Sequence, residues 1–115
     1  DIISNAQIWL PDSNGTEAFD TEPVKVFTRN LSGTGVCLVS DIEIAKGTKV
    51  KVELRLTDEL IITLRCIVLR VNSIKIKNRN KYELGMIFTD ISKKDQEALI
   101  RFIFDQQRLQ LKRKE

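Results

Sequence analysis

The residues best suited to binding chemistry lie in one short polar segment, residues 28–35, with the sequence TRNLSGTG. Asn30 and Ser32 are two residues apart, so an extended backbone would point both side chains to the same side. Gly33 and Gly35 have no Cβ, which lets a ligand or another strand approach the backbone closely. Amide, hydroxyl and backbone N–H groups together suit recognition of an anion or a purine edge. The segment therefore predicts a small polar binding site.

The groups that most enzymes use for catalysis are missing from this sequence. It has no histidine, the commonest general base and metal ligand. No Walker loop, G-x-S-x-G elbow or cysteine cluster takes its place. Asp58 and Glu59 are adjacent acids at an expected turn, where carboxylates are usually solvated. The sequence predicts a binding protein rather than an enzyme, with no metal and no cofactor.

Length and composition predict one domain. The chain has 115 residues, of which 42% are hydrophobic, and this fits a single core. We expect residues 1–115 to form one unit, with a β-rich body at about 5–91 and a helix at about 92–110. Because the sequence begins at Asp1, we interpret it as a domain excised from a longer protein. No apolar run approaches the roughly 20 residues of a membrane span and no secretion signal is apparent, which predicts a cytoplasmic protein.

The two cysteines predict buried, reduced thiols. Cys37 and Cys66 lie far apart in the sequence, and each sits in an apolar, strand-like run. Free cysteines prefer protein cores, and disulfides are rare in the reducing cytosol. A disulfide is the less favoured alternative.

Six runs rich in β-branched or alternating residues predict six strands. They cover residues 6–10, 23–30, 35–40, 49–56, 60–71 and 82–88. The polar segment falls at the turn between the second and third of them. Gly85, inside the last run, is a candidate for a β-bulge or for close approach of another group. Several short strands with one terminal helix predict an all-β fold, a small antiparallel barrel or sandwich.

The C-terminal segment changes to helical periodicity. Ser92 followed by Asp95 is typical of a helix N-terminus, because the Ser oxygen accepts from a free backbone N–H and the acid suits the helix dipole. The apolar residues that follow at helical spacing are Leu99, Ile100, Phe102, Ile103 and Phe104. We expect an amphipathic helix packed on the sheet. The width of its apolar face leaves open a partner-binding helix or a homodimer formed through it.

Residues 30–35, NLSGTG, resemble the [D/N]-x-S-x-x-G motif of PilZ domains, the bacterial receptors for cyclic di-GMP. The runs at 67–71 and 82–92 and the helix through Phe102 are similar to that family in order and spacing, so the resemblance covers about residues 24–105. It implies a six-stranded antiparallel PilZ-type β-barrel with a C-terminal α-helix. It also implies a nucleotide site on the barrel's outer surface, lined by the counterparts of Asn30, Ser32 and Gly35, with Gly33 in the same loop.

Two arginines are further candidates for this nucleotide site. Arg70 holds a strand position from which such domains can offer a side chain to a guanine, and a guanidinium can stack on the base or bind its O6 and N7. Arg29 adjoins Asn30 and could contribute in part. Regular strand alternation, however, points Arg29 to the opposite face unless the backbone turns there. For both residues, a solvated arginine on a strand is the alternative.

The sequence departs from the family pattern at its N-terminal end. PilZ domains that bind cyclic di-GMP also carry an R-x-x-x-R motif just ahead of the first strand, whose arginines clamp guanines and phosphates. Residues 1–5, DIISN, occupy that neighbourhood and do not match it. Either the motif precedes Asp1 or this domain lacks it. Losing two bidentate contacts of about 1.5–3 kcal/mol each would weaken binding by roughly two to four orders of magnitude.

Two functions from different classes follow. The first is a cyclic di-GMP receptor that changes conformation on binding and regulates a partner protein or fused domain, in motility, exopolysaccharide or biofilm control. The second is a protein-interaction module that keeps the barrel without the nucleotide and uses the apolar helix or the basic segment at residues 75–81. We expect no DNA or RNA binding, because one Trp and one Tyr offer few stacking platforms and the first 23 residues carry only acidic charges.

Overall fold

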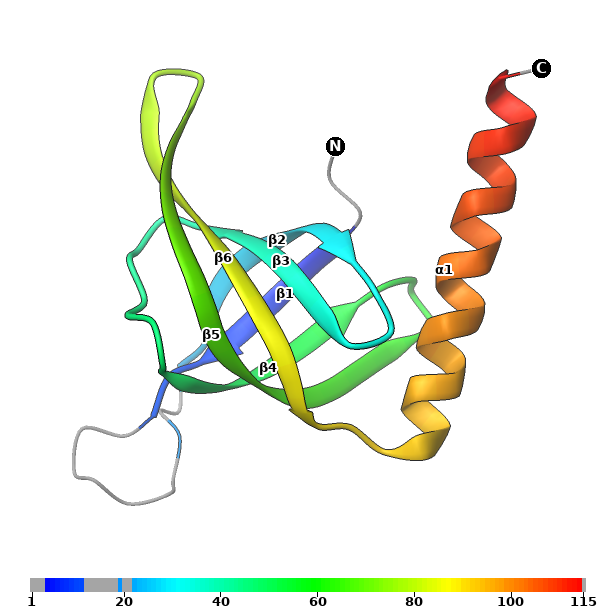
Figure 1. Ribbon diagram of the computed structural model, residues 1–115, viewed down its shortest axis with the longest axis horizontal. Helices are drawn as coiled ribbons and strands as arrows, with labels where there is room; N and C mark the ends of the chain where they lie inside the picture. The colour runs from blue at the N-terminus through cyan, green and yellow to red at the C-terminus, as the bar shows by residue number, and fades with distance from the viewer. Residues whose placement is uncertain (1–3, 12–18, 20–21, 115) are drawn as a thin grey trace.

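Six antiparallel strands close into a barrel that is followed by one helix (Figure 1). The computed structural model describes residues 4–11, 19 and 22–114. The strands join in the order β1-β2-β3-β6-β5-β4, and β4 returns to β1. This is the six-stranded barrel with a C-terminal helix that the sequence predicted. The elements are β1 (Ser4–Trp9), β2 (Val24–Leu31), β3 (Gly35–Ser40), β4 (Lys49–Arg55), β5 (Ile61–Ile76), β6 (Arg79–Asp90) and α1 (Lys93–Lys114).

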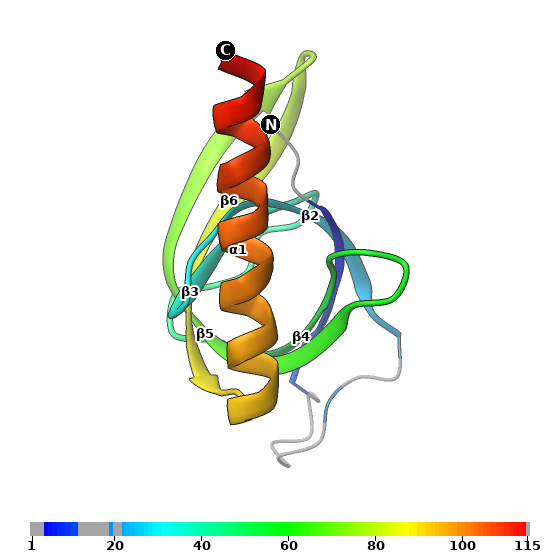
Figure 2. The ribbon, with the colours of Figure 1, turned by 90° about the vertical axis from the view of Figure 1, so that its right-hand side faces the viewer.

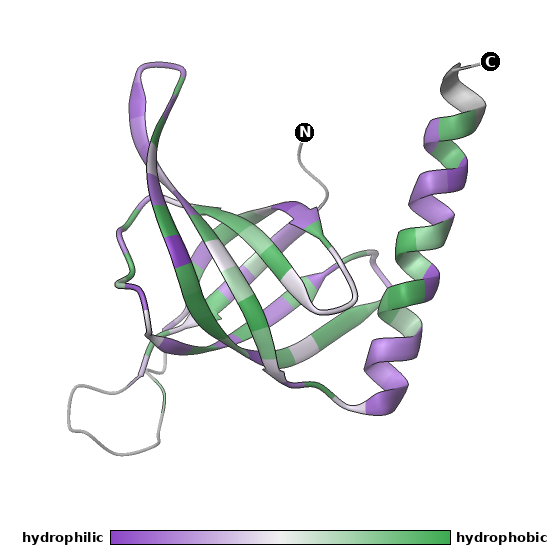
Figure 3. Ribbon diagram, viewed as in Figure 1, coloured by the Kyte–Doolittle hydropathy of each residue, from purple (hydrophilic) through white to green (hydrophobic). Residues whose placement is uncertain are grey.

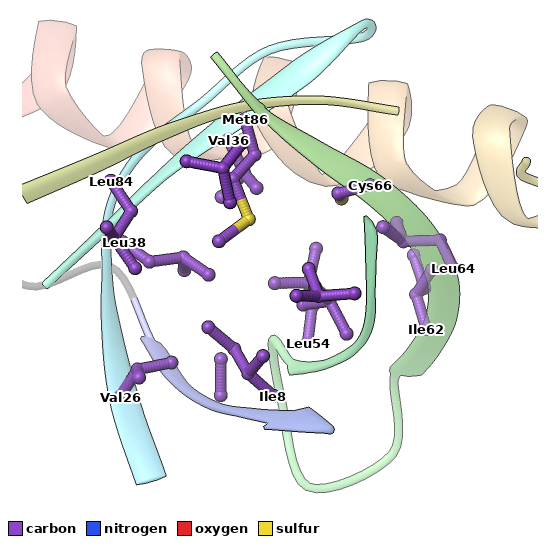
Figure 4. Packing of buried hydrophobic residues seen from close by; sticks show 14 of the residues in the cluster. Ile8, Val26, Val36, Leu38, Leu54, Ile62, Leu64, Cys66, Leu84 and Met86 are labelled. Atoms are coloured by element: carbon purple, nitrogen blue, oxygen red, sulfur yellow. The ribbon is translucent and has the colours of Figure 1, made fainter. Parts of the chain in front are cut away.

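Aliphatic side chains fill the barrel interior, because the strands alternate between inward apolar residues and outward polar ones. In β4, Val50, Val52 and Leu54 are fully buried, and the charged residues between them face outward. Figure 4 shows side chains from all six strands pointing into the same interior, with Ile8, Leu38 and Leu84 among those labelled. The filled interior leaves the outer face of the barrel as the place for a polar site.

Helix α1 crosses one end of the barrel (Figure 2). Leu99 and Phe102 are buried in the main core, which confirms the predicted amphipathic packing. Ser92 Oγ accepts a hydrogen bond from the backbone N–H of Asp95 at 3.1 Å and so caps the helix, as predicted. The buried face is narrower than the sequence suggested, because Ile100 and Phe104 are exposed. No helix among the described residues is long and apolar enough to cross a membrane.

The basic segment at residues 75–81 is mostly strand. β5 runs to Ile76 and β6 begins at Arg79, so the two strands form a long hairpin that projects from the barrel (Figure 1). Its turn is only Lys77 and Asn78, with φ of 50° and 67°, the left-handed pair that suits a two-residue hairpin. Hydrophilic residues cover much of this hairpin, in contrast to the alternating barrel strands (Figure 3). The helix is also longer than predicted and extends to Lys114.

Replacing Leu99 with Ala should lower the free energy of unfolding by about 2–5 kcal/mol, because it removes fully buried methyl groups where α1 meets the barrel. The matched control is Leu109→Ala in the same helix, where the side chain is 51% exposed and a change within about 0.5 kcal/mol is expected. Urea denaturation followed by circular dichroism measures both. Equal losses for the two variants would contradict the packing of α1 on the barrel.

Candidate functional site

The turn between β2 and β3 is built around the side chain of Ser32. Its Oγ accepts hydrogen bonds from the backbone N–H groups of Thr34 at 3.3 Å and Gly35 at 3.1 Å. The backbone N–H of Ser32 donates to the carbonyl oxygen of Gly35 at 2.9 Å. Ser32 therefore stabilises the loop by hydrogen bonds within it. The sequence pattern alone does not distinguish this structural role from a direct contact with a ligand.

Asn30 closes the other side of the same turn. Its Oδ1 accepts a hydrogen bond from the backbone N–H of Leu31 at 2.9 Å, which fixes the orientation of the amide. The NH₂ group of this side chain carries two donors that an anion or a purine acceptor could use. Asn30 is exposed on the outer face of the barrel, as the sequence predicted.

The two glycines of the turn differ in what they require. A Cβ at Gly35 would lie 2.5 Å from the carbonyl oxygen of Met86, so only glycine allows β3 and β6 to approach this closely. A Cβ at Gly33 would meet Ile100 of α1 at an ordinary 3.7 Å. Gly35 thus serves the contact between two strands, and Gly33 lies where the turn faces the helix.

Arg29 shares the outer face with Asn30 because β2 contains a bulge. Thr28 pairs with Leu38, and Asn30 pairs with Cys37, so Arg29 is an extra residue in β2 and the alternation is broken. Thr28 remains fully buried, whereas Arg29 and Asn30 are both exposed. The alternation rule, which places Arg29 on the opposite face, is wrong here because the backbone turns at this bulge.

A second bulge brings Arg70 to the same surface. Val68 pairs with Met86 and Arg70 pairs with Gly85, which leaves Leu69 as the extra residue of β5. The Arg70 side chain lies directly against Gly85, since a Cβ there would be 2.9 Å from Nε and 3.1 Å from Nη2. The predicted close approach at Gly85 is therefore an approach by a guanidinium, which a larger residue would push away.

These residues meet in two adjoining hollows on the outer face of β2, β3, β5 and β6. Asn30, Cys37 and Arg70 line both of them. The first has a volume of about 320 Å³, and the second about 370 Å³. The first also includes Leu31, Ser32, Gly35, Val36, Leu69, Gly85 and Met86, and the second also includes Arg29 and Glu83. Of the predicted site residues, Gly33 alone lies in the lining of neither hollow.

Glu83 and Cys37 belong to the site although the sequence did not single them out for it. Glu83 Oε2 lies 3.0 Å from Arg29 Nη1, so an ion pair spans β3 and links β2 to β6. An acid on a half-exposed strand gives no sequence signal that separates it from a solvated one. Its place follows from the pairing of the strands, which brings Glu83 of β6 within reach of Arg29 across β3.

The local charges act on the Cys37 thiol. Burial raises the pKa of Cys37, the Glu83 carboxylate raises it further, and Arg70 and Arg29 lower it. Burial alone raises the pKa of Cys66 in the barrel interior to about 12. Both cysteines are free, and Cys66 is buried as predicted, whereas Cys37 is only partly buried. Among the described residues, no group of three or more His, Cys, Asp or Glu could hold a metal ion.

The start of β1 lies next to the bulge in β2. Ser4 pairs with Thr28 and Asn5 with Phe27, so the chain enters the barrel one residue away from Arg29. Residues 1–3 of the segment that departs from the R-x-x-x-R pattern lie outside the described residues. Ser4, the first described residue of β1, is therefore aligned with the residue that precedes Arg29.

Comparison with known proteins finds one family and several solved structures. The sequence pattern of the family described as PilZ domain matches residues 10–105. The PilZ domain of YcgR from Escherichia coli, solved with cyclic di-GMP, is similar with a TM-score of 0.70 at 15% identity, over 98% of this chain and 93% of that one. A search among curated proteins finds no match.

Two longer proteins share the fold. MotI/DgrA, an inhibitor of motility from Bacillus subtilis, matches with a TM-score of 0.71 at 20% identity, over 93% of this chain and 47% of its own. MrkH from K. pneumonia in its apo state matches with a TM-score of 0.73 at 20% identity, over 96% of this chain and 50% of its own. This chain therefore spans about half the length of these two proteins.

The two thiols should react at different rates with iodoacetamide at pH 8. Cys66 is fully buried with a pKa of about 12, so it should stay unmodified until the protein unfolds. Cys37 should react, but more slowly than a free thiol, because its raised pKa leaves less thiolate at this pH. Peptide mapping by mass spectrometry, with a sample unfolded in urea as the control, measures both rates. Equal rates in the native protein would contradict the position of Cys66.

Proposed function

This chain belongs to the PilZ domain family, and on that premise we propose that it is a receptor domain for cyclic di-GMP. The observation that carries the proposal is the meeting of Asn30, the Ser32 turn and Arg70 around one hollow of the outer face. These groups bind and orient a ligand, and the proposed role is recognition rather than catalysis. A receptor for a second messenger made inside the cell would act in the cytoplasm.

The polar groups of the first hollow match the acceptors of a guanine nucleotide. The Asn30 NH₂ can donate to a guanine acceptor or to a phosphate oxygen. The Arg70 guanidinium can stack on a base or donate in a bidentate manner to O6 and N7. Ser32 and Gly35 contribute by holding the turn and by letting β3 and β6 meet, while Gly33 lies at the edge near α1.

The net charge of the two hollows suits a ligand with two phosphates. Arg29 and Arg70 provide two positive charges against the single negative charge of Glu83. Charge-assisted hydrogen bonds from guanidinium to phosphate are among the stronger contacts available to a protein. We propose that an arginine-bearing segment ahead of β1, where the native protein has one, completes the clamp from its place beside Arg29.

The turn is also a route from the ligand to the helix. Gly33 lies against the side chain of Ile100, and a hollow of about 180 Å³ separates Asn30 and Leu31 from residues of α1. A ligand bound at this turn would therefore act on residues that lie next to α1. We propose that the resulting shift alters how α1 is presented to a partner protein or a further domain, or to a second copy of this chain.

Exposed apolar residues on α1 favour a second candidate function, a protein-interaction module. Phe104 is 59% exposed and Leu111 is 64% exposed, and large apolar side chains at this exposure mark a contact surface when they gather. In this alternative the barrel is a scaffold and the nucleotide is not bound. Titration with cyclic di-GMP separates the two candidates, because only the receptor binds the nucleotide.

Calorimetric titration of cyclic di-GMP tests the receptor function directly. It is done on this chain and on a form that includes any native sequence ahead of Asp1. Asn30→Ala and Arg70→Ala should each weaken binding about 10-fold or more, since a hydrogen bond to a charged group contributes about 1.5–3 kcal/mol. The control is Arg55→Ala, an exposed arginine on β4 outside both hollows. No binding to either form, or an unchanged affinity for Asn30→Ala, would favour the interaction module.

Gly85→Ala should weaken cyclic di-GMP binding about as much as Arg70→Ala does, because the new Cβ would lie 2.9 Å from Arg70 Nε and displace this flexible side chain. The double variant should bind no more weakly than either single one. Gly85→Ala should cost about 1 kcal/mol of stability or less, whereas Gly35→Ala, which meets a backbone oxygen at 2.5 Å, should cost about 1–3 kcal/mol or more. Thermal denaturation separates these effects. Full binding by Gly85→Ala would show that the position of Arg70 does not matter.

A further inference from the structure

The second hollow contains a carboxylate that phosphate binding does not explain. The Glu83 side chain is 25% exposed, and it lies in the hollow that Arg29, Asn30, Cys37 and Arg70 also line. A negative charge at this place repels a phosphate. Its influence reaches the hollow itself, because Glu83 raises the pKa of the Cys37 thiol. A ligand group that offers Glu83 a hydrogen-bond donor therefore fits this hollow better than a second anion does.

Guanine offers such donors and adenine does not offer the same set. The Watson–Crick edge of guanine carries N1–H and an N2 amino group side by side, and a carboxylate can accept from both at once. Adenine presents the unprotonated N1 at the same place, so its lone pair would face the carboxylate oxygens. A buried acceptor opposed by another acceptor loses its partners and costs binding free energy. A carboxylate at this edge therefore discriminates between the two purines.

The ion pair prepares Glu83 for this role. Arg29 Nη1 donates to Oε2 at 3.0 Å, which fixes the carboxylate, and Oε1 and the second lone pair of Oε2 remain as acceptors. Arg29 lies on the outer face like Lys25 and Phe27, and the bulge that follows it brings Asn30 to the same face beside this contact. The hollow of about 370 Å³ falls within the range of about 300–1,000 Å³ that is typical of small-molecule sites.

We propose that the Glu83 carboxylate accepts hydrogen bonds from N1–H and N2–H of one guanine in this hollow and so selects guanine over adenine. Arg29 is then a positioning residue that holds Glu83 and offsets its charge beside the ligand phosphates. The inference rests on the proposed function, and it adds the base that the hollow recognises and the residue that recognises it.

A different role for Glu83 predicts the opposite sign. If Glu83 only occupies Arg29 and competes with a phosphate for it, removal of its charge frees Arg29 and strengthens binding of any cyclic dinucleotide. If Glu83 recognises guanine, removal of its charge weakens the binding of cyclic di-GMP and reduces the preference for this ligand over cyclic di-AMP. The two roles are therefore separated by one substitution and two ligands.

The test is Glu83→Gln in the natural full-length protein, with calorimetric titration of cyclic di-GMP and of cyclic di-AMP. Gln keeps the size of the side chain and one acceptor oxygen, but it loses the charge and replaces the other acceptor with a donor. The affinity for cyclic di-GMP should fall about 10- to 100-fold, and the ratio of the two affinities should fall by a similar factor. The matched control is Glu53→Gln, because Glu53 is 23% exposed and pairs with Arg55 on β4, away from the site.

The outcomes separate this inference from the function on which it rests. If the wild-type protein does not bind cyclic di-GMP, the receptor function and this inference both fail. If the wild type binds and Glu83→Gln leaves the affinity ratio unchanged, only the inference fails. An equal gain in affinity for both ligands would likewise overturn it and assign Glu83 to competition for Arg29. A thermal melt of each variant, with the melting temperature close to that of the wild type, shows that the fold is intact.

Discussion

Every strand of the barrel pairs with two neighbours, and this closure fixes the register of the whole sheet. A strand in a closed sheet cannot slip by one residue without turning its apolar side chains outward. The extra residues Arg29 in β2 and Leu69 in β5 are therefore absorbed locally as bulges while the core remains in place. These two bulges lie beside residues of the candidate site, next to Asn30 and next to Arg70, whereas a third register shift, between Arg65 and Cys66, lies away from it. The fixed register of the core thus explains how one extra residue in each of two strands leaves Asn30 and Arg70 on the outer face.

The groups of the site are held by the protein before any ligand arrives. Ser32 Oγ is occupied by the N–H groups of its own turn, and Arg29 is occupied by Glu83. Arg70 rests against Gly85, where the missing Cβ gives it room. Such preorganisation lowers the entropic cost of ordering side chains on binding. In the proposed complex the ligand would share these contacts, so the Glu83 carboxylate would exchange part of its pairing with Arg29 for donors of the base.

The sequence predicted those features that follow from local patterns. Alternation placed the strands and the core, the Ser92–Asp95 pair placed the start of α1, and the family motif drew attention to Asn30 and Ser32. It failed where the outcome depends on contacts between strands. Nothing local to residues 28–30 distinguishes a bulge from a regular strand, so the sequence could not show that the backbone turns there and brings Arg29 and Asn30 to one face. The sequence predicts strands that end at residue 71 and resume at residue 82, whereas β5 runs to Ile76 and β6 begins at Arg79, because Lys77 and Asn78 lack the Asn-Gly or Asp-Gly signal of a two-residue turn. A role for Glu83 could be inferred only from the structure, which shows that Arg29 lies beside it.

Helix α1 lies next to the turn of the candidate site and continues away from the barrel core. The buried residues Leu99 and Phe102 fix the N-terminal half of the helix on the barrel, while Leu109 is 51% exposed further along. A Cβ at Gly33 would lie 3.7 Å from the side chain of Ile100, so the turn faces the half of the helix that the core holds. In the proposed coupling, two arrangements of the turn would act on this fixed half and so favour two positions of the exposed half. Coupling of this kind needs only a small difference in free energy between the two positions, because the ligand can shift the equilibrium by no more than its differential affinity for them.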